Sequence, residues 1–299
     1  MSFNNLSKTF RYVNEEGRSI TFLYDNGFLI NKPVGIDTVQ ISLSQAQGIN
    51  QVGATVQSTN VQPRPVNISG RLVGEFQAEN KDLLMSVIRP DLTGKLYADD
   101  YYIDCRPTAT PTVGPEPEFA FFQFSLLAPY PYWAQDASAS AVLAGVGGKF
   151  RLWDGDESHR APDGSLGSWM ISGEYVFGAP IETQFVRIAN RGQLPVPFTM
   201  TVSARSEVSN PMITNVETGE FLLLRHTLAA GERVVVEITH ERTYVTSSLH
   251  GDIRGALSLK STLNRLAVGE NIIKPEASGG GDGMEIVISF SSEIVGITV

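Results

Sequence analysis

The run VNISGRLV at residues 66–73 decides the fold class, because its apolar side chains recur at every second position. Alternation of this period places one face of a β-strand on a core and the other face in solvent. The same alternation appears in SITFLY at residues 19–24 and in VQISL at residues 39–43. The chain is therefore expected to be mainly β.

One segment breaks this pattern and predicts a helix. Residues 81–89 follow Asn80, a suitable N-cap, and carry apolar side chains at helical spacing up to Pro90, which ends the run. Strands resume at residues 95–98, 101–106 and 119–127. The last of these is almost continuously apolar, which predicts a strand covered on both faces. Together these elements predict an N-terminal β-sandwich or barrel with one α-helix.

Residues 47–65 form a polar stretch that interrupts the alternation within this first half. Long segments without a share in the core usually serve function. We expect this stretch to be a loop that reaches a neighbouring subunit.

The motif APYPYW at residues 128–133 ends the first half, since prolines do not continue a central strand. Small polar residues follow, and they predict a domain boundary near residue 135. The two expected domains are residues 1–135 and 136–299. Short strands separated by turn signals predict a jelly-roll-like β-sandwich for the second domain.

Composition excludes several classes of function. A net charge of −9 argues against affinity for nucleic acid phosphates, which requires clustered Lys and Arg. The single cysteine, Cys105, excludes an internal disulfide framework and is expected to lie in a core. Neither a signal peptide nor a membrane span is apparent, so we expect synthesis and folding in the cytoplasm.

The sequence predicts no enzyme, cofactor or metal site. Nucleophile-elbow, P-loop and dinucleotide fingerprints are absent. His159, His226 and His250 lie far apart, without carboxylate or cysteine partners at ligand spacing. The segment from His240 to Tyr244 only begins like a zinc-protease motif and lacks its second histidine.

Three aromatic residues of the second half, Trp153, Trp169 and Tyr175, are candidates for a platform that stacks on sugar rings. Core packing is the alternative role for the same side chains. A carbohydrate-binding protein that recognises the host through its C-terminal sandwich is therefore an alternative function. A hydrolase requires a cleft with converging acids, and nothing in the sequence indicates one.

The order of the motifs resembles the distal tail proteins of siphophages that infect mainly Gram-positive bacteria. Their Arg-x-x-x-Ile-x-Gly strand is similar to RPVNISG at 64–70, and a Leu-Leu helix and an Ala-Pro-x-Pro-x-Trp signature follow in the family's order. The second half resembles the family's C-terminal module in VRIANRG at 186–192, NVETG at 215–219 and LAVGEN at 266–271.

This resemblance implies a structural virion component and not an enzyme. It implies a hexameric ring at the phage tail tip, assembled in the host cytoplasm, with a galectin-like C-terminal domain that in some members binds carbohydrate. The implied partners are other copies of the chain, the tail tube protein, and a tail-associated lysin, tail fibre or receptor-binding protein. DNA passes through the ring only as cargo, and host cell-wall polysaccharide is a further candidate partner.

A channel for DNA should present carboxylates or neutral groups, because lysines and arginines there would bind phosphates. The candidate lumen acids are Glu79, Asp91, Asp99 and Asp100. A capping or turn role is the alternative for each.

Overall fold

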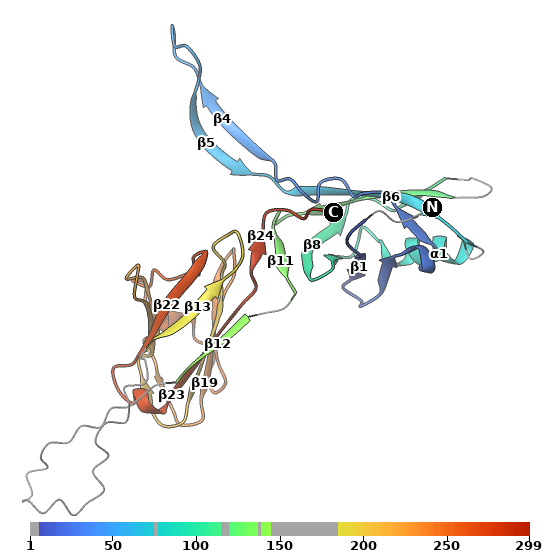
Figure 1. The fold of residues 1–299 in the computed structure, drawn as a ribbon. Helices are drawn as coiled ribbons and strands as arrows, with labels where there is room; N and C mark the ends of the chain where they lie inside the picture. The colour runs from blue at the N-terminus through green and yellow to red at the C-terminus, as the bar shows by residue number, and fades with distance from the viewer. Residues whose placement is uncertain (1–5, 75–76, 115–119, 137–138, 145–184) are drawn as a thin grey trace, which may run out of the picture. The chain divides into compact units, whose positions relative to one another are not determined.

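The computed structural model describes residues 6–74, 77–114, 120–136, 139–144 and 185–299 (Figure 1). Contacts group the chain into two units. Unit 1 comprises residues 1–139, 191–196 and 291–299, and unit 2 comprises residues 140–190 and 197–290. The expectation of a mainly β chain is confirmed. The separate stability of two domains that meet near residue 135 stays a prediction.

Unit 1 is built on a ten-stranded antiparallel sheet with the order β2-β1-β7-β8-β10-β6-β3. Off this path, β9 pairs with β10, and β11 pairs with β8 and β24. The bounds are β1 Phe10–Asn14, β2 Ser19–Phe22, β3 Phe28–Ile30, β6 Arg64–Leu72, β7 Gly94–Ala98, β8 Tyr101–Pro107, β9 Thr112–Val113, β10 Phe121–Ala128, β11 Trp133–Gln135 and β24 Glu293–Ile294, with a 3-10 turn at Tyr24–Asn26.

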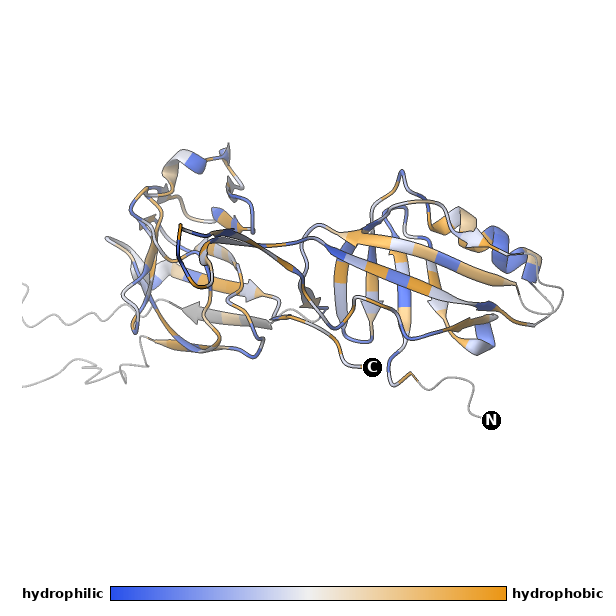
Figure 2. Cartoon of the chain, turned by 90° about the horizontal axis from the view of Figure 1, so that it is seen from above, coloured by the Kyte–Doolittle hydropathy of each residue, from blue (hydrophilic) through white to orange (hydrophobic). Residues whose placement is uncertain are grey.

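The sheet of unit 1 curls into a nearly closed barrel around an apolar core. Its edge strands β2 and β3 meet through Phe22 and Phe28, whose ring centroids lie 5.9 Å apart in an edge-on contact. Apolar and polar residues alternate along the strands, as Figure 2 shows. Strand β6 has this pattern, with Val66, Ile68 and Leu72 fully buried, as the opening sequence predicts. Cys105 is buried, which confirms its expected place in a core.

The helix exists but differs from its predicted bounds. Helix α1 spans Gln77–Val87, so Asn80 lies inside it and is not the N-cap. The Asn80 side chain instead donates to the carbonyl oxygen of Asn26 at 3.4 Å. The helix therefore already includes Gln77, three residues before the N-cap that the sequence predicted. Leu84 and Val87 place the apolar face of the helix in the core.

Strand β10 corrects a second expectation. It is not covered on both faces, because buried and exposed side chains alternate along it, and Phe121 and Leu127 are each 38% exposed. A continuous apolar run indicates a strand but does not show what covers its outer face. The outer side of this strand thus carries apolar surface.

The polar stretch at residues 47–65 is also different from the expected loop. Most of it belongs to a β-hairpin of β4, Ile41–Ala46, and β5, Thr55–Val61, and to the start of β6. The two strands pair only with each other, with a register shift between Ser44 and Gln45. Every residue of both strands is exposed, so the hairpin contributes nothing to the core of unit 1.

Unit 2 contains two main sheets, with the orders β12-β23-β14-β19-β20-β21 and β13-β22-β16-β17, and a small pair, β15-β18. Alternate residues of both main sheets are buried, as in the expected β-sandwich. The bounds are β12 Ala139–Ala144, β13 Val186–Asn190, β14 Thr199–Ala204, β15 Val208–Ser209, β16 Met212–Asn215, β17 Phe221–Leu223, β18 Thr227–Leu228, β19 Arg233–Ile238, β20 Thr243–Ser247, β21 Gly251–Asp252, β22 Gly269–Glu276 and β23 Met284–Phe290, with 3-10 turns at Arg254–Ala256 and Gly281–Gly283.

Among the helices of the described residues, none is both long and apolar enough to cross a membrane.

Candidate functional site

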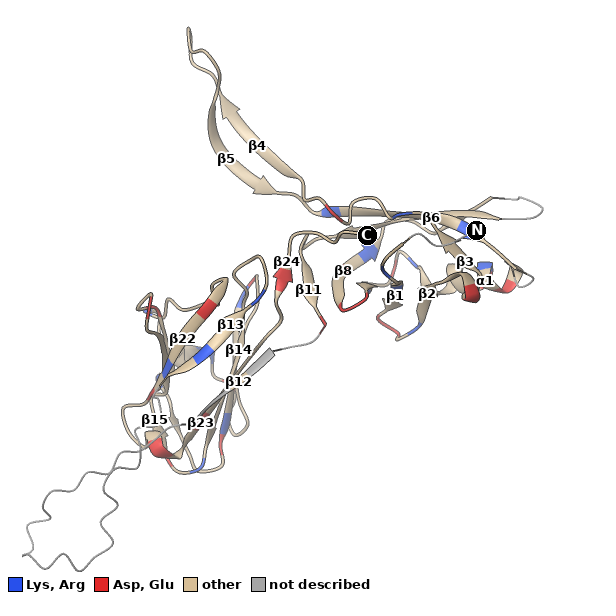
Figure 3. Cartoon of the chain, in the orientation of Figure 1, with Lys and Arg blue, Asp and Glu red and all other residues tan. Residues whose placement is uncertain are grey.

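The β4–β5 hairpin is the most unusual surface of unit 1. Residues 38–63 contain no Asp, Glu, Lys or Arg, and the hairpin is accordingly free of charge colours in Figure 3. We call its exposed apolar residues the hairpin surface. Ile49 and Val52 at the tip are fully exposed, and the strand residues are about half exposed. The hairpin surface comprises Ile41, Leu43, Ile49, Val52, Val56 and Val61.

Side-chain amides order the tip of this hairpin. Gln51 accepts the backbone N–H of Gly48 at 2.9 Å and donates to the hydroxyl of Thr55 at 3.0 Å. Gln47 donates to the carbonyl oxygen of Gln51 at 3.1 Å. Polar residues that looked like loop composition in the sequence therefore support a defined turn.

A buried arginine anchors the foot of the hairpin, where β5 leads into β6. Arg64 is 2% exposed, and its guanidinium donates to the carbonyl oxygens of Gly35 at 3.1 Å, Ile36 at 2.7 Å and Val295. Burial lowers the pKa of this guanidinium, although Asp37 nearby counteracts the effect. The arginine that opens the Arg-x-x-x-Ile-x-Gly motif is thus a structural clamp.

Two further donors converge on the same Ile36 oxygen. They are the backbone N–H of Ile297 at 3.0 Å and the indole N–H of Trp133 at 3.1 Å. Trp133 ends the APYPYW signature and is completely buried. The two sequence signatures of the first half therefore meet at one carbonyl group, which fixes the base from which the hairpin projects.

The four candidate lumen acids are all exposed, but they do not gather at one place. Glu79 lies on α1, and Asp91 lies between α1 and β7. Asp99 and Asp100 form the turn at the other end of β7. Which of these carboxylates line a channel stays a prediction.

Two of these acids have local partners. The hydrogen bond from Arg89 holds the pKa of Asp91 below its usual value. Burial raises the pKa of Asp99, but the Thr9 N–H and the Lys8 ammonium, at 2.9 and 3.1 Å, outweigh it and lower the pKa. Asp99 has a φ of 50°, which fits the alternative role in a tight turn.

The candidate sugar platform of Trp153, Trp169 and Tyr175 lies outside the described residues. The carbohydrate-binding alternative consequently stays a prediction.

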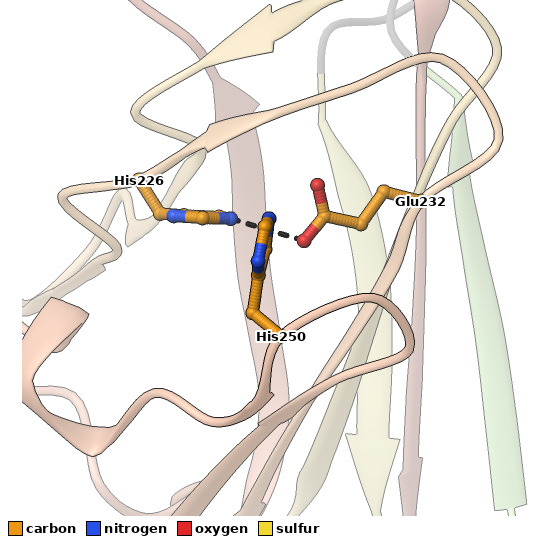
Figure 4. Close-up of side chains that lie close together, drawn as sticks. All are labelled: His226, Glu232 and His250. Atoms are coloured by element: carbon orange, nitrogen blue, oxygen red, sulfur yellow. Dashed lines mark hydrogen bonds and ion pairs between the residues drawn. The ribbon is translucent and has the colours of Figure 1, made fainter.

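Unit 2 brings together residues that the sequence analysis treated as separate. His226 precedes β18, Glu232 precedes β19, and His250 follows β20, yet one ligand atom from each lies within 4.8 Å of the others (Figure 4). The imidazole Nε2 of His226 is 3.0 Å from Oε1 of Glu232. The rings of His226 and His250 meet edge-on, with centroids 5.6 Å apart.

Glu232 is the buried centre of this cluster, with a side chain that is 0% exposed. Its Oε1 accepts the hydroxyl of Ser247 at 2.5 Å, and its Oε2 accepts the backbone N–H of Ala229 at 2.9 Å. Burial raises the pKa of Glu232, but these hydrogen bonds and His226 together outweigh it and lower the pKa. The carboxylate is thus held in its charged form.

The expectation that the histidines lie far apart is wrong for His226 and His250. Antiparallel pairing of Val234 with Ser247 brings the start of β19 beside the end of β20, and this places Glu232 near His250. No spacing rule for a single helix or loop could reveal such a set. The sequence signal for such a cluster is the position of each residue in a short connection next to a predicted strand.

Comparison with known proteins agrees with the resemblance in the sequence. Residues 191–291 match the family described as siphovirus-type tail component, C-terminal domain. A comparison with curated proteins found no match. The resemblance to distal tail proteins is confirmed by this match and by the likeness of the whole fold to a solved distal tail protein.

That solved structure is the SPP1 Dit (gp 19.1) protein, described as a paradigm of the hub adsorption apparatus in phages that infect Gram-positive bacteria. It is 11% identical, with a TM-score of 0.67, and the match covers 95% of this chain and 98% of that one. A chain of the phage P2 baseplate in its activated conformation with Ca is 8% identical, with a TM-score of 0.52 over 98% of this chain and 100% of that one. These descriptions name tail and baseplate proteins and no enzymatic activity.

Proposed function

We propose that this chain, as a relative of the distal tail proteins, forms a homohexameric ring in the tail tip of a phage. The ring joins the tail tube to the host-adhesion apparatus, which consists of a tail-associated lysin, tail fibre or receptor-binding protein. It leaves a channel for DNA. The protein is assembled in the host cytoplasm and resides in the virion.

The hairpin surface is the observation that carries the assembly proposal. An isolated two-stranded hairpin is at best marginally stable in water. Uncharged edge strands with exposed apolar side chains are also open to unwanted pairing unless another chain covers them. Residues 38–63 lack every charged residue that would protect such an edge. We infer that the hairpin packs on the neighbouring copy in the ring.

A cyclic ring of six copies is built from two different surfaces that meet head to tail. The hairpin surface supplies one of them. The outer face of β10, with Phe121 and Leu127 exposed, is an apolar surface on the same unit and a suitable receiver. In a hexamer each copy then uses its hairpin on one side and receives a hairpin on the other.

The test is the mass of the purified chain by light scattering, together with a negative-stain image. A six-fold mass and a ring with a central hole are expected. In a matched variant, residues 41–61 are replaced by a short Gly-Ser turn between Gln40 and Gln62, whose backbones are bonded at 2.8 Å. This variant should dissociate at concentrations at which the parent ring persists.

The control is Leu259→Ser, which removes a fully exposed leucine of unit 2 and should leave the mass unchanged. A parent chain that stays monomeric at high concentration contradicts the ring. A hairpin deletion that assembles as well as the parent at low concentration contradicts the role of the hairpin surface.

A further inference from the structure

The His226, Glu232 and His250 cluster offers the donor set of a transition-metal site. Two imidazole nitrogens and one carboxylate oxygen suit zinc, whereas calcium and magnesium prefer sites made of oxygen alone. His226 lies directly before β18, Glu232 lies between β18 and β19, and His250 lies between β20 and β21. The cluster is independent of the hairpin surface and of the ring proposal.

We propose that unit 2 binds one zinc ion through Nε2 of His226, a ring nitrogen of His250 and the carboxylate of Glu232. Water fills the remaining coordination position on the side of His250, which is exposed. The bound ion adds a link between the segment of His226 and the segments of Glu232 and His250, which the pairing of β19 with β20 already joins.

The distances are close to those that zinc requires. Zinc lies about 2.0–2.2 Å from nitrogen and oxygen ligands, so tetrahedral ligand atoms lie roughly 3.3 Å apart. The His226 and Glu232 atoms, at 3.0 Å, need to separate by a few tenths of an ångström. The ring nitrogen of His250 lies within 4.8 Å of the other two ligand atoms. Rotation of the His250 side chain, which its exposed position permits, brings this nitrogen to the ion.

The surroundings also hold the ligands in place. The Ser247 hydroxyl donates to Oε1 of Glu232 and accepts the backbone N–H groups of Leu249 and His250, each at 3.1 Å. One serine therefore couples the carboxylate to the turn that carries His250. Such outer partners commonly fix the orientation of metal ligands and affect affinity.

A simple ion pair between His226 and Glu232 is the competing interpretation. An ion pair does not need His250, whose imidazole contacts the His226 ring and makes no hydrogen bond to any residue that the structure describes. The two interpretations therefore differ in what substitution of His250 does. Because His250 is exposed, its replacement should also leave the fold intact.

The test is calorimetric titration of the full chain, without a histidine tag and after treatment with chelator, with zinc chloride. One zinc ion per chain is expected, with no comparable binding of calcium or magnesium. His250→Ala and His226→Ala should each weaken binding by more than tenfold, and Ser247→Ala by about 10–100-fold. The control His240→Gln alters the histidine at the opposite end of the β19–β20 hairpin and should bind as the parent does.

Cobalt titration supplies a second measurement. The parent and His240→Gln should develop the visible absorption of four- or five-coordinate cobalt, and His250→Ala should not. Absence of saturable zinc binding overturns the proposal. So does binding that survives both His226→Ala and His250→Ala, or binding that His240→Gln weakens equally.

Discussion

Replacement of Arg64 by methionine should destabilise unit 1 by about 2–4 kcal/mol. The Ile36 oxygen keeps two other donors, whereas the oxygens of Gly35 and Val295 lose their bond to Arg64. A buried acceptor without its donor costs about 1–3 kcal/mol, which gives at most about 2–6 kcal/mol for these two partly buried acceptors. Part of this is offset, because the variant no longer buries a cation.

Scanning calorimetry measures this effect as a fall of roughly 4–16 °C in the unfolding temperature of unit 1, at about 2–4 °C per kcal/mol for a unit of this size. Arg71→Met is the control, since Arg71 lies on the same strand with an exposed side chain. Arg64→Lys should recover only part of the lost stability. The compact ammonium of lysine cannot reach the oxygens of both Gly35 and Val295, as the wider guanidinium does. The reasoning is refuted if Arg64→Met and Arg71→Met unfold within about 0.5 kcal/mol of each other.

Three further predictions concern the linker, the lumen and Glu232. Limited proteolysis should cut first within residues 134–141, and the two fragments should still co-elute because residues 291–299 belong to unit 1; a first cut elsewhere, with this segment resistant, would count against this boundary. Purified rings should not retain DNA. Tight, salt-sensitive retention of DNA, or a lumen dominated by Lys and Arg, would overturn the prediction that acidic or neutral groups line the channel. The lowered pKa of Glu232 stabilises the folded chain fully above pH 4.5, and this contribution is lost as the pH falls through the folded-state pKa. In chelator, urea unfolding of Glu232→Gln should therefore show a weaker loss of stability with acid than the parent, and parallel curves would contradict this sign.

Sequence reasoning worked where the determinant is local. Period-two alternation predicted β6 because successive side chains of a strand point to opposite faces, and apolar residues occupy the buried face. The same reasoning was wrong about β10, since an apolar run does not reveal whether a neighbouring layer covers its second face. It was also wrong about residues 47–65, because polar composition does not distinguish a loop from an exposed strand such as β5. The alternation at residues 39–43 predicted a strand with one buried face, but every residue of β4 is exposed.

Neither the contacts of Arg64 nor the histidine cluster could be predicted from the sequence, because both bring together residues that are far apart along the chain. Arg64 was visible as part of a motif, but its acceptor on Val295 lies 231 residues away in the sequence. Glu232 and His250 lie close together because β19 pairs with β20, although they are 18 residues apart in the sequence. Such contacts depend on strand register, which spacing along the chain does not encode.

The membership of residues 291–299 in unit 1 has a consequence for synthesis. Ile297 is 2% exposed within the core of that unit, and its backbone bonds to Ile36. A ribosome must translate all of residues 197–290 before this part of the core emerges. A nascent chain with only the first 139 residues therefore lacks the segment that completes the anchor around Arg64. A chain that is truncated before residue 291 is therefore expected to leave the core of unit 1 incomplete.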